Sequence, residues 1–405
     1  MIEISAAQAT DKTVAYKTVT DQLVTWQEKG KPQSAFWQSE AISAPPKNIV
    51  VADDTTSAKD AYKLICEGTA FLYKGDFQNA KQMLQAITRK VDSKPIAPTD
   101  NLTQAFHQHR ARQIQRANIT NKILIELNYG ACDLKRAPDV KDAVAGALIT
   151  NAKIDKLPPK MLLSLRELLG MVGAHEWRKK GVAVDALPAN IHAHYGVYSP
   201  IRGEYLELIN NTSFGNAKTA FDIGTGTGVI AAILVTRGIK AVIATDNNVR
   251  ALNCAFDNIE KLNLKQYITL EQANLFPGGS KTADLIVCNP PWLPAKANAP
   301  IEHAIYDPNS MMLKGFLSGV KVHLNDNGEA WLILSDLAEH LGLRSNEELQ
   351  KWIGDAGLSV VEKLDIAPKH AKSSDQSDPL YAARVKEITS LYRLKVKGCQ
   401  YQPSF

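Results

Sequence analysis

The sequence has few of the features that are typical of exported proteins, of membrane-spanning proteins or of proteins stabilised by a structural metal ion. Its 405 residues include five scattered cysteines (66, 132, 254, 288 and 399) and no Cys-x-x-Cys pair, which argues against a disulfide framework or a structural zinc site. No apolar run approaches the ~18 residues of a membrane span. Residues 1–20 lack the basic start and apolar core of a secretory signal. We therefore expect a reduced, cytoplasmic protein that binds neither membrane nor metal.

The excess of one sign of charge over the other is also small. The chain has 47 Lys and Arg residues and 42 Asp and Glu residues, for a net charge of +5. The excess lies in residues 1–185, whereas residues 186–405 are close to neutral. Any electrostatic attraction for nucleic acid would therefore act on the N-terminal half. Its candidate contact is the predicted helix 102–122, which carries Arg110, Arg112, Arg116 and Lys122. An ordinary solvated helix face explains these charges equally well.

The composition, 45% hydrophobic and 22% charged, is typical of a packed globular protein, and the length allows two or three domains. Helical periodicity over 57–92 resembles a single tetratricopeptide unit, which without further copies predicts a helical hairpin within its domain. A second helix is predicted from about 158 to 178. These segments predict a mainly helical N-terminal domain over 1–180, which would bind the substrate or a partner.

Two short strands are predicted within 181–200, and they indicate a β-hairpin linker between this domain and the next. His192 and His194 share one face of the second strand. No cysteine or acidic cluster accompanies them, so we interpret both histidines as structural residues and not as metal ligands.

A glycine-rich turn follows the apolar strand predicted over 219–223. Gly224, Gly226 and Gly228 alternate with threonines, Asp222 precedes them, and an apolar helix begins at Val229. Glycines let the backbone approach a ligand closely, and the helix start offers free N–H groups. A dinucleotide fingerprint fits this spacing only if Ala231 takes its third glycine position.

Two further motifs come at the ends of later strands. Asp246 ends the strand 241–245, where an acid is placed to bind ribose hydroxyls. The strand 283–288 ends in Asn289-Pro290-Pro291-Trp292. In an open α/β sheet, ligands bind at the carboxyl ends of the strands. A dehydrogenase would leave the Asn-Pro-Pro-Trp motif unexplained.

Together, the glycine loop, the ribose acid and the Asn-Pro-Pro-aromatic motif resemble the class I S-adenosylmethionine-dependent methyltransferases of the small-domain, HemK-like type. The resemblance covers roughly residues 185–400. It implies an α/β, Rossmann-like domain over 201–405 with a seven-stranded sheet of order 3-2-1-4-5-7-6, strand seven being antiparallel. It also implies S-adenosyl-L-methionine as the cofactor, and methylation of adenine N6, guanine N2 or a glutamine side-chain nitrogen.

The resemblance assigns the cofactor-binding residues to the strand ends: Asp222, Gly224, Thr225, Gly226, Gly228, Asp246, Asn247, Asn274, Leu275 and Asn289. Asn274 stands where the family usually has an acid, and its carbonyl oxygen can still accept a hydrogen bond. The substrate-pocket candidates are Tyr198, Arg202, Glu204 and Pro291. Here the chain departs from the HemK pattern Pro-Arg-x-x-Thr/Ser-Glu, since Arg202 and Glu204 follow Pro200 by two and four residues.

The catalytic candidates are Asn289, Pro290 and Trp292. The Asn289 side-chain oxygen and the Pro290 carbonyl would each accept an N–H of the target nitrogen. Both bonds would strengthen as that nitrogen becomes tetrahedral and positive. Trp292 offers a flat face on which a base or a planar amide can stack.

The favoured function is N-methylation of a macromolecule, with an rRNA or tRNA base as substrate. The alternative is a HemK-like glutamine N5 methyltransferase acting on a translation-related protein. A small-molecule methyltransferase and a non-catalytic donor-binding scaffold stay open, since fold alone does not decide between them. The chain has no large target-recognition domain, which disfavours a restriction-type DNA methyltransferase.

Overall fold

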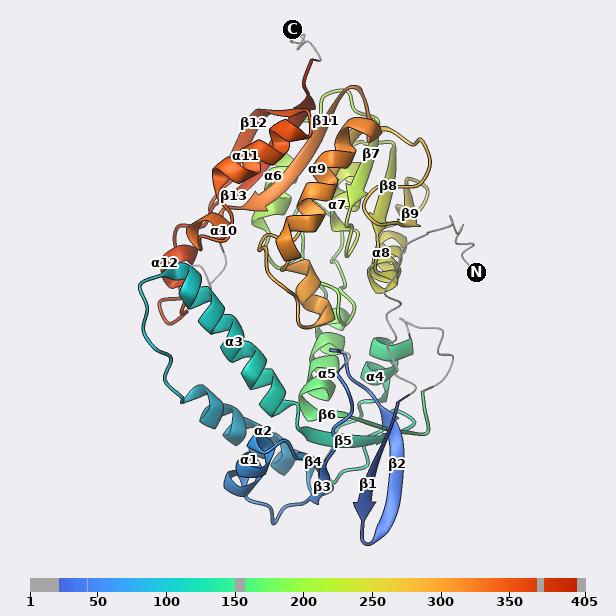
Figure 1. The fold of residues 1–405 in the computed structure, drawn as a ribbon. Helices are drawn as coiled ribbons and strands as arrows, with labels where there is room; N and C mark the ends of the chain where they lie inside the picture. The colour runs from blue at the N-terminus through green and yellow to red at the C-terminus, as the bar shows by residue number, and fades with distance from the viewer. Residues whose placement is uncertain (1–21, 42, 150–156, 370–374, 399–405) are drawn as a thin grey trace.

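The computed structural model describes residues 22–41, 43–149, 157–369 and 375–398, which form two α/β units stacked end to end (Figure 1). Residues 1–20, for which the sequence predicts no secretory signal, lie outside this range. None of the described helices is long and apolar enough to cross a membrane. The described residues also contain no group of three His, Cys, Asp or Glu side chains that could hold a metal ion.

The C-terminal unit is built on a seven-stranded sheet in the order β12-β13-β11-β10-β7-β8-β9. Read from β9, with β7 counted as strand 1, this order is 3-2-1-4-5-7-6. The seventh strand, β13, is antiparallel to both its neighbours. The predicted topology is therefore confirmed. The strands are β7 (Thr219–Ile223), β8 (Ala241–Asp246), β9 (Ile268–Gln272), β10 (Ala283–Cys288), β11 (Leu324–Ser335), β12 (Leu358–Ile366) and β13 (Thr389–Val396).

Helices cover both faces of this sheet. One face packs against α6 (Glu204–Asn211), α7 (Val229–Thr236) and α8 (Val249–Lys261), and the other against α9 (Met311–His323) and α11 (Asn346–Asp355). Every residue of α7 from Val229 to Val235 is buried, as expected of a helix that is apolar on all sides. Short helical turns complete the unit: η2 (Pro300–Ala304), η3 (Pro308–Ser310), α10 (Leu337–His340) and α12 (Tyr381–Arg384).

The N-terminal unit has more residues in helices than in strands, but it also has a sheet that the prediction of a mainly helical domain left out. It contains a six-stranded mixed sheet, β1-β2-β6-β5-β4-β3. Its strands are β1 (Leu23–Glu28), β2 (Lys31–Trp37), β3 (Ile49–Ala52), β4 (Ala70–Tyr73), β5 (Ile123–Asn128) and β6 (Lys160–Ser164), and its helices are α1 (Ala58–Cys66), α2 (Phe77–Asp92), α3 (Leu102–Thr120), α4 (Lys141–Leu148) and α5 (Leu165–Lys180).

The error has a physical cause. All four residues of β4 are buried, as are four of the five in β6, and a strand buried on both faces shows no alternation that would distinguish it from a buried helix. The tetratricopeptide-like segment 57–92 therefore contains α1, β4 and α2, and the helix predicted over 158–178 begins with β6.

The predicted β-hairpin of residues 181–200 is also wrong, because the segment forms a single antiparallel bridge, between Val182 and Ile191. Beyond that bridge, the backbone N–H of His192 donates to the side chain of Asn258 at 2.8 Å and not to a partner strand. A tertiary contact thus replaces the pairing that the sequence suggested.

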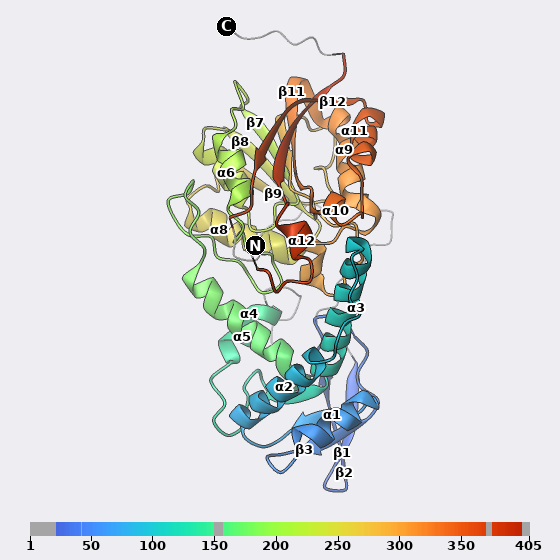
Figure 2. The same cartoon turned by 90° about the vertical axis from the view of Figure 1, so that its left-hand side faces the viewer.

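The two units contact each other through α3, which begins beside α10 and α12 and runs back to the N-terminal unit (Figure 2). Phe106 of α3 is buried among Leu293, Leu337 and Leu380 of the C-terminal unit. The Thr103 hydroxyl donates to the carbonyl of Leu341 at 2.7 Å. Arg250, at the start of α8, pairs with Glu40, which follows β2. The N-terminal unit therefore lies against the carboxyl ends of β8 and β10.

Candidate active site

The glycine loop joins β7 to α7 in a conformation that requires glycine. Gly224, Gly226 and Gly228 have φ values of +75°, +56° and +80°, in the left-handed region that other residues rarely adopt. A Cβ on Gly224 would lie 2.7 Å from Cε of Met312, and one on Gly228 would lie 3.2 Å from Cα of Ala255. A Cβ on Gly226 would meet no described atom within 4 Å. The loop therefore has one open side, at Gly226.

Asp222, near the end of β7, accepts two hydrogen bonds that hold this loop in place. Its Oδ2 accepts the Thr225 hydroxyl at 2.6 Å and the Ala231 N–H at 3.1 Å. The Thr225 hydroxyl thus points toward the carboxylate. Among the described residues, the buried Oδ1 of Asp222 has no partner. Burial raises the pKa of Asp222 to about 7, so this carboxyl group titrates near neutrality.

Asp246, at the end of β8, ties the second strand to the glycine loop. Its Oδ2 accepts the Gly226 N–H at 3.0 Å and its Oδ1 accepts the Asn248 N–H at 2.9 Å. Burial raises the pKa of Asp246. Each carboxylate oxygen has a second acceptor position, so this residue can also bind hydroxyl groups. Asn247 beside it is exposed.

Asn274 and Leu275 follow β9 and approach the same edge. Asn274 is exposed, whereas Leu275 packs partly buried against the core. Leu275 has a φ of +73°, and its carbonyl accepts the Thr245 hydroxyl of β8. The structure therefore brings Leu275 to the end of β8 through its backbone.

Asn289 follows β10, the strand beside β7, in a register that pairs Cys288 with Ile223. The Trp292 indole N–H donates to Oδ1 of Asn289 at 2.9 Å, and Pro290 between them is buried. The Arg202 guanidinium lies over the Trp292 ring, 5.2 Å from its centroid, and is held by Glu387 at 3.0 Å. One face of Trp292 is therefore covered by a cation, and the ring is partly buried against the core of the C-terminal unit, so the stacking role of Trp292 stays a prediction.

The first residue of α6, Glu204, provides a second buried carboxylate in the C-terminal unit. Glu204 is buried, and its Oε1 has no partner among the described residues. Burial raises the pKa of the neighbouring Tyr205, and the charges of Tyr198, Asp222 and Glu204 raise it further. Tyr198 itself is exposed. Two buried carboxylates, each with an unpartnered oxygen, thus lie near one tyrosine beside the glycine loop.

The sequence analysis missed three residues that shape this site. Both carboxylate oxygens of Asp307 accept N–H groups at the start of α9, from Met312 at 2.9 Å and Leu313 at 3.1 Å. The Asp-Pro pair before that helix could have signalled this cap. The buried Arg344 donates to the Trp292 carbonyl at 3.5 Å, and Glu387 positions Arg202. No local pattern marks Arg344 or Glu387, because each meets the site only through tertiary packing.

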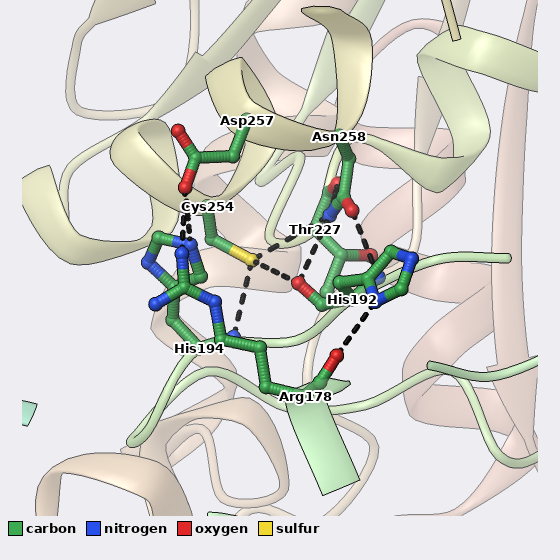
Figure 3. Close-up of polar contacts among 7 residues, drawn as sticks. All are labelled: Arg178, His192, His194, Thr227, Cys254, Asp257 and Asn258. Carbon is green, nitrogen blue, oxygen red and sulfur yellow. Dashed lines mark hydrogen bonds and ion pairs between the residues drawn. The ribbon is translucent and has the colours of Figure 1, made fainter. Parts of the chain in front are cut away.

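Behind the glycine loop, Asn258 of α8 connects the loop to the segment between the units (Figure 3). Its amide donates to the Thr227 carbonyl at 3.0 Å, and its Oδ1 accepts the His192 N–H at 2.8 Å. Next to it, Asp257 accepts Arg178 of α5 at 2.8 Å and His194 at 2.9 Å. These contacts give both histidines the structural role that the sequence suggested.

Burial and the nearby Arg178 lower the pKa of His194, which favours a neutral imidazole in this cluster. The imidazole Nε2–H therefore donates to Asp257.

Most arginines of the basic helix predicted over 102–122 bind other parts of the protein. Arg110 is buried, donates to the Lys296 carbonyl at 2.8 Å and pairs with Glu302 at 3.1 Å. Arg112 donates to carbonyl groups at the end of α2, including that of Lys94 at 2.6 Å. Two of the three arginines thus have structural roles, and the interpretation of this helix as a phosphate-contacting arm is wrong for them.

Comparison with known proteins agrees with this geometry. Residues 190–356 match the family model described as "Methyltransferase small domain". The chain is 32% identical over 133 residues to a release factor glutamine methyltransferase of Rhodopirellula baltica, covering 29% of this chain and 45% of that protein. It is 31% identical over 126 residues to the tRNA1(Val) (adenine(37)-N6)-methyltransferase of Cytophaga hutchinsonii, covering 29% and 51%.

A ribosomal protein uL3 glutamine methyltransferase of Neisseria gonorrhoeae is 34% identical over 114 residues, covering 28% of this chain and 36% of that protein. The chain thus spans about half, or less, of the length of these relatives. The glycine loop, Asp246 and the Asn-Pro-Pro-Trp motif all lie within the segment that the family model matches. Residues 190–356 are thus similar to the methyltransferase small domain, and the sheet order of the C-terminal unit agrees with that similarity.

Proposed function

We propose that this protein is an S-adenosylmethionine-dependent N-methyltransferase that acts in the cytoplasm on a planar amino or amide nitrogen of a macromolecule. An rRNA or tRNA base is the favoured substrate, and residues 201–405 are the methyltransferase domain. The observation that carries the proposal is Asn289, a hydrogen-bond acceptor placed at the end of β10 and beside the glycine loop by the pairing of Cys288 with Ile223.

The residues around the loop fit the methyl donor, which carries a sulfonium, an α-ammonium and a ribose. The unpartnered oxygens of Asp222 and Glu204 suit a ligand with two cationic groups, since a buried carboxylate without a partner is costly. The free acceptor positions of Asp246 suit ribose hydroxyls. The open side of Gly226 allows the ligand to approach the backbone. When bound, the donor supplies an activated methyl group.

The chain's own residues would orient the target nitrogen. Such a nitrogen is a poor nucleophile while its lone pair is delocalised. Asn289 Oδ1 would accept one N–H through its second lone pair, because Trp292 occupies only one. The Pro290 carbonyl would accept the other N–H. Both bonds would favour the tetrahedral, positive nitrogen of the transition state, and the two prolines would keep the acceptors in place.

The identity of the methylated macromolecule is a separate step of the proposal. The excess of positive charge in residues 1–185 favours RNA. Two of the relatives above are named for glutamine methylation and one for tRNA adenine methylation, so a glutamine of a translation-related protein is the second candidate. The test is methyl transfer from radiolabelled donor into a lysate of a strain that lacks this protein, with N289A as the matched inactive control.

Nuclease-sensitive label that depends on Asn289 would support the RNA assignment, and protease-sensitive label would support the glutamine assignment instead. Label in a small-molecule fraction would overturn the macromolecular substrate. Absence of transfer by the wild-type protein, although it binds the donor, would indicate a scaffold without turnover.

A further inference from the structure

A cavity of about 660 Å³ lies between the two units. Its walls come from the end of β2, from α3, from the start of α5 and from the segment that follows Asn-Pro-Pro-Trp. Amide side chains are prominent in it: Gln38, Gln113, Asn118, Asn121 and Asn298. Residues 298, 299 and 302, which form one wall, follow Trp292 in the chain by 6 to 10 residues.

A second groove, of about 370 Å³, adjoins this cavity on the N-terminal unit. Arg116 and Arg166 line both, and Arg89 lines the second groove with Thr88 and Thr120. Three arginines from three helices, α2, α3 and α5, thus gather where the two hollows meet. We call this group, Arg89, Arg116 and Arg166, the arginine cluster.

The charge of the arginine cluster is only partly balanced. Arg116 pairs with Asp92 at 3.1 Å. Within the described part of the chain, no carboxylate forms an ion pair with Arg89 or Arg166. Partial burial of the Arg166 guanidinium lowers its pKa and the charge of Arg116 lowers it further, whereas the charge of Glu302, which also lines the cavity, acts in the opposite direction. Three guanidinium groups that line adjoining hollows, two of them without an ion-paired carboxylate among the described residues, suit an anion, because a bound anion stabilises their charged forms.

We propose that the arginine cluster and the amide-lined cavity bind the backbone of a single-stranded stretch of RNA, with phosphates on Arg89 and Arg166 and the next nucleotides in the cavity toward Asn298. Guanidinium groups match phosphate geometry, and amide side chains can pair with base edges and 2′-hydroxyls. This inference rests on the proposed function for its substrate class.

The amide lining favours RNA over an acidic peptide, because each unstacked base presents donors and acceptors on its edge, whereas the side chains of an acidic peptide present only acceptors and leave its backbone as the sole source of donors.

The experiment measures binding of a fluorescein-labelled 12-nucleotide single-stranded RNA by anisotropy between 50 and 200 mM salt, with labelled polyglutamate as the competing probe. The variant R89Q/R166Q removes two cations without reversing charge. Each lost phosphate contact should lower the salt slope by ~0.7. The double variant should therefore have a slope lower by about 1.4 and bind about tenfold more weakly at low salt.

The matched control is K240Q, which removes an exposed cation at the start of β8, on the end of the sheet away from the N-terminal unit. K240Q should bind like the wild type, and R89K/R166K should recover most of the affinity. Thermal unfolding of each variant checks that it folds.

The inference is overturned if R89Q/R166Q keeps the wild-type affinity and slope, or if the wild type prefers polyglutamate. RNA binding is measured without donor, so a failure of methyl transfer would overturn the proposed function and leave this result standing.

Discussion

The indole N–H of Trp292 donates to Oδ1 of Asn289 at 2.9 Å, which fixes the amide of the residue that we propose to bind the target nitrogen. Arg202 lies over the same ring, and Arg344 donates to the Trp292 carbonyl. Trp292 is thus held from two sides while it orients Asn289. It is a positioning residue through its N–H, in addition to the stacking that the sequence predicts for its ring.

Replacing Trp292 with Phe should separate these two roles, because Phe keeps an aromatic face and lacks the N–H. We expect kcat to fall about fivefold to tenfold, since the lost hydrogen bond contributes ~1 kcal/mol. Donor affinity should stay unchanged. Steady-state kinetics and calorimetric titration of the donor measure the two effects. W352F, on α11, is the control, and an equal loss of kcat in both variants would contradict the positioning role.

Asp246 should contribute to donor binding through its free acceptor positions. Replacement with Ala removes these and also the bond from the Gly226 N–H. A hydrogen bond to a charged group contributes ~1.5–3 kcal/mol, so the dissociation constant of the donor should rise about tenfold to a hundredfold. Titration with the demethylated donor measures this without turnover. An unchanged dissociation constant for D246A would exclude the proposed ribose contact.

Asn258 should control the glycine loop without contacting any ligand. N258D keeps the Oδ1 acceptor for His192 and loses the donor to the Thr227 carbonyl, whereas N258A loses both bonds. N258A leaves two buried groups unsatisfied at ~1–3 kcal/mol each, and N258D places a buried carboxylate oxygen against the Thr227 carbonyl, which costs more. The melting temperature should therefore fall in both variants, and most in N258D. In both variants the donor KM should rise more than kcat falls. If the donor KM is unaffected although the protein is destabilised, Asn258 has a structural role only.

The catalytic half of the molecule could be predicted from sequence because its signals are local. Gly224, Gly226 and Gly228 need positive φ, and Asp246 and Asn289 directly follow strands. The N-terminal sheet could not be predicted in this way. Its strands β4 and β6 are short and almost wholly buried, so they show neither the two-residue alternation of an exposed strand nor the 3.6-residue period of an amphipathic helix. Arg110 appeared to be a surface cation because nothing local reveals its partners, Lys296 and Glu302, almost two hundred residues away.

Donor binding should depend on pH through Asp222. Its pKa in the folded protein is about 7, above the ordinary value of 3.8, so the folded state retains the proton longer than the unfolded chain does. The free energy of unfolding should therefore fall as the pH rises from about 4 to about 7. A cationic donor prefers the ionised carboxylate, so its affinity should rise about tenfold between pH 6 and pH 8.

The check is calorimetric titration of the donor at pH 6 and pH 8, in two buffers that differ in ionisation enthalpy. Below pH 7 the wild type should release a proton on binding, because the donor favours the charged form of Asp222. D222N keeps an acceptor for Thr225 and Ala231 but cannot ionise, so it should bind weakly with a nearly flat pH profile. A D222N profile as steep as that of the wild type would assign the titration to another group, and Asp246, whose pKa burial also raises, would be tested next with D246N.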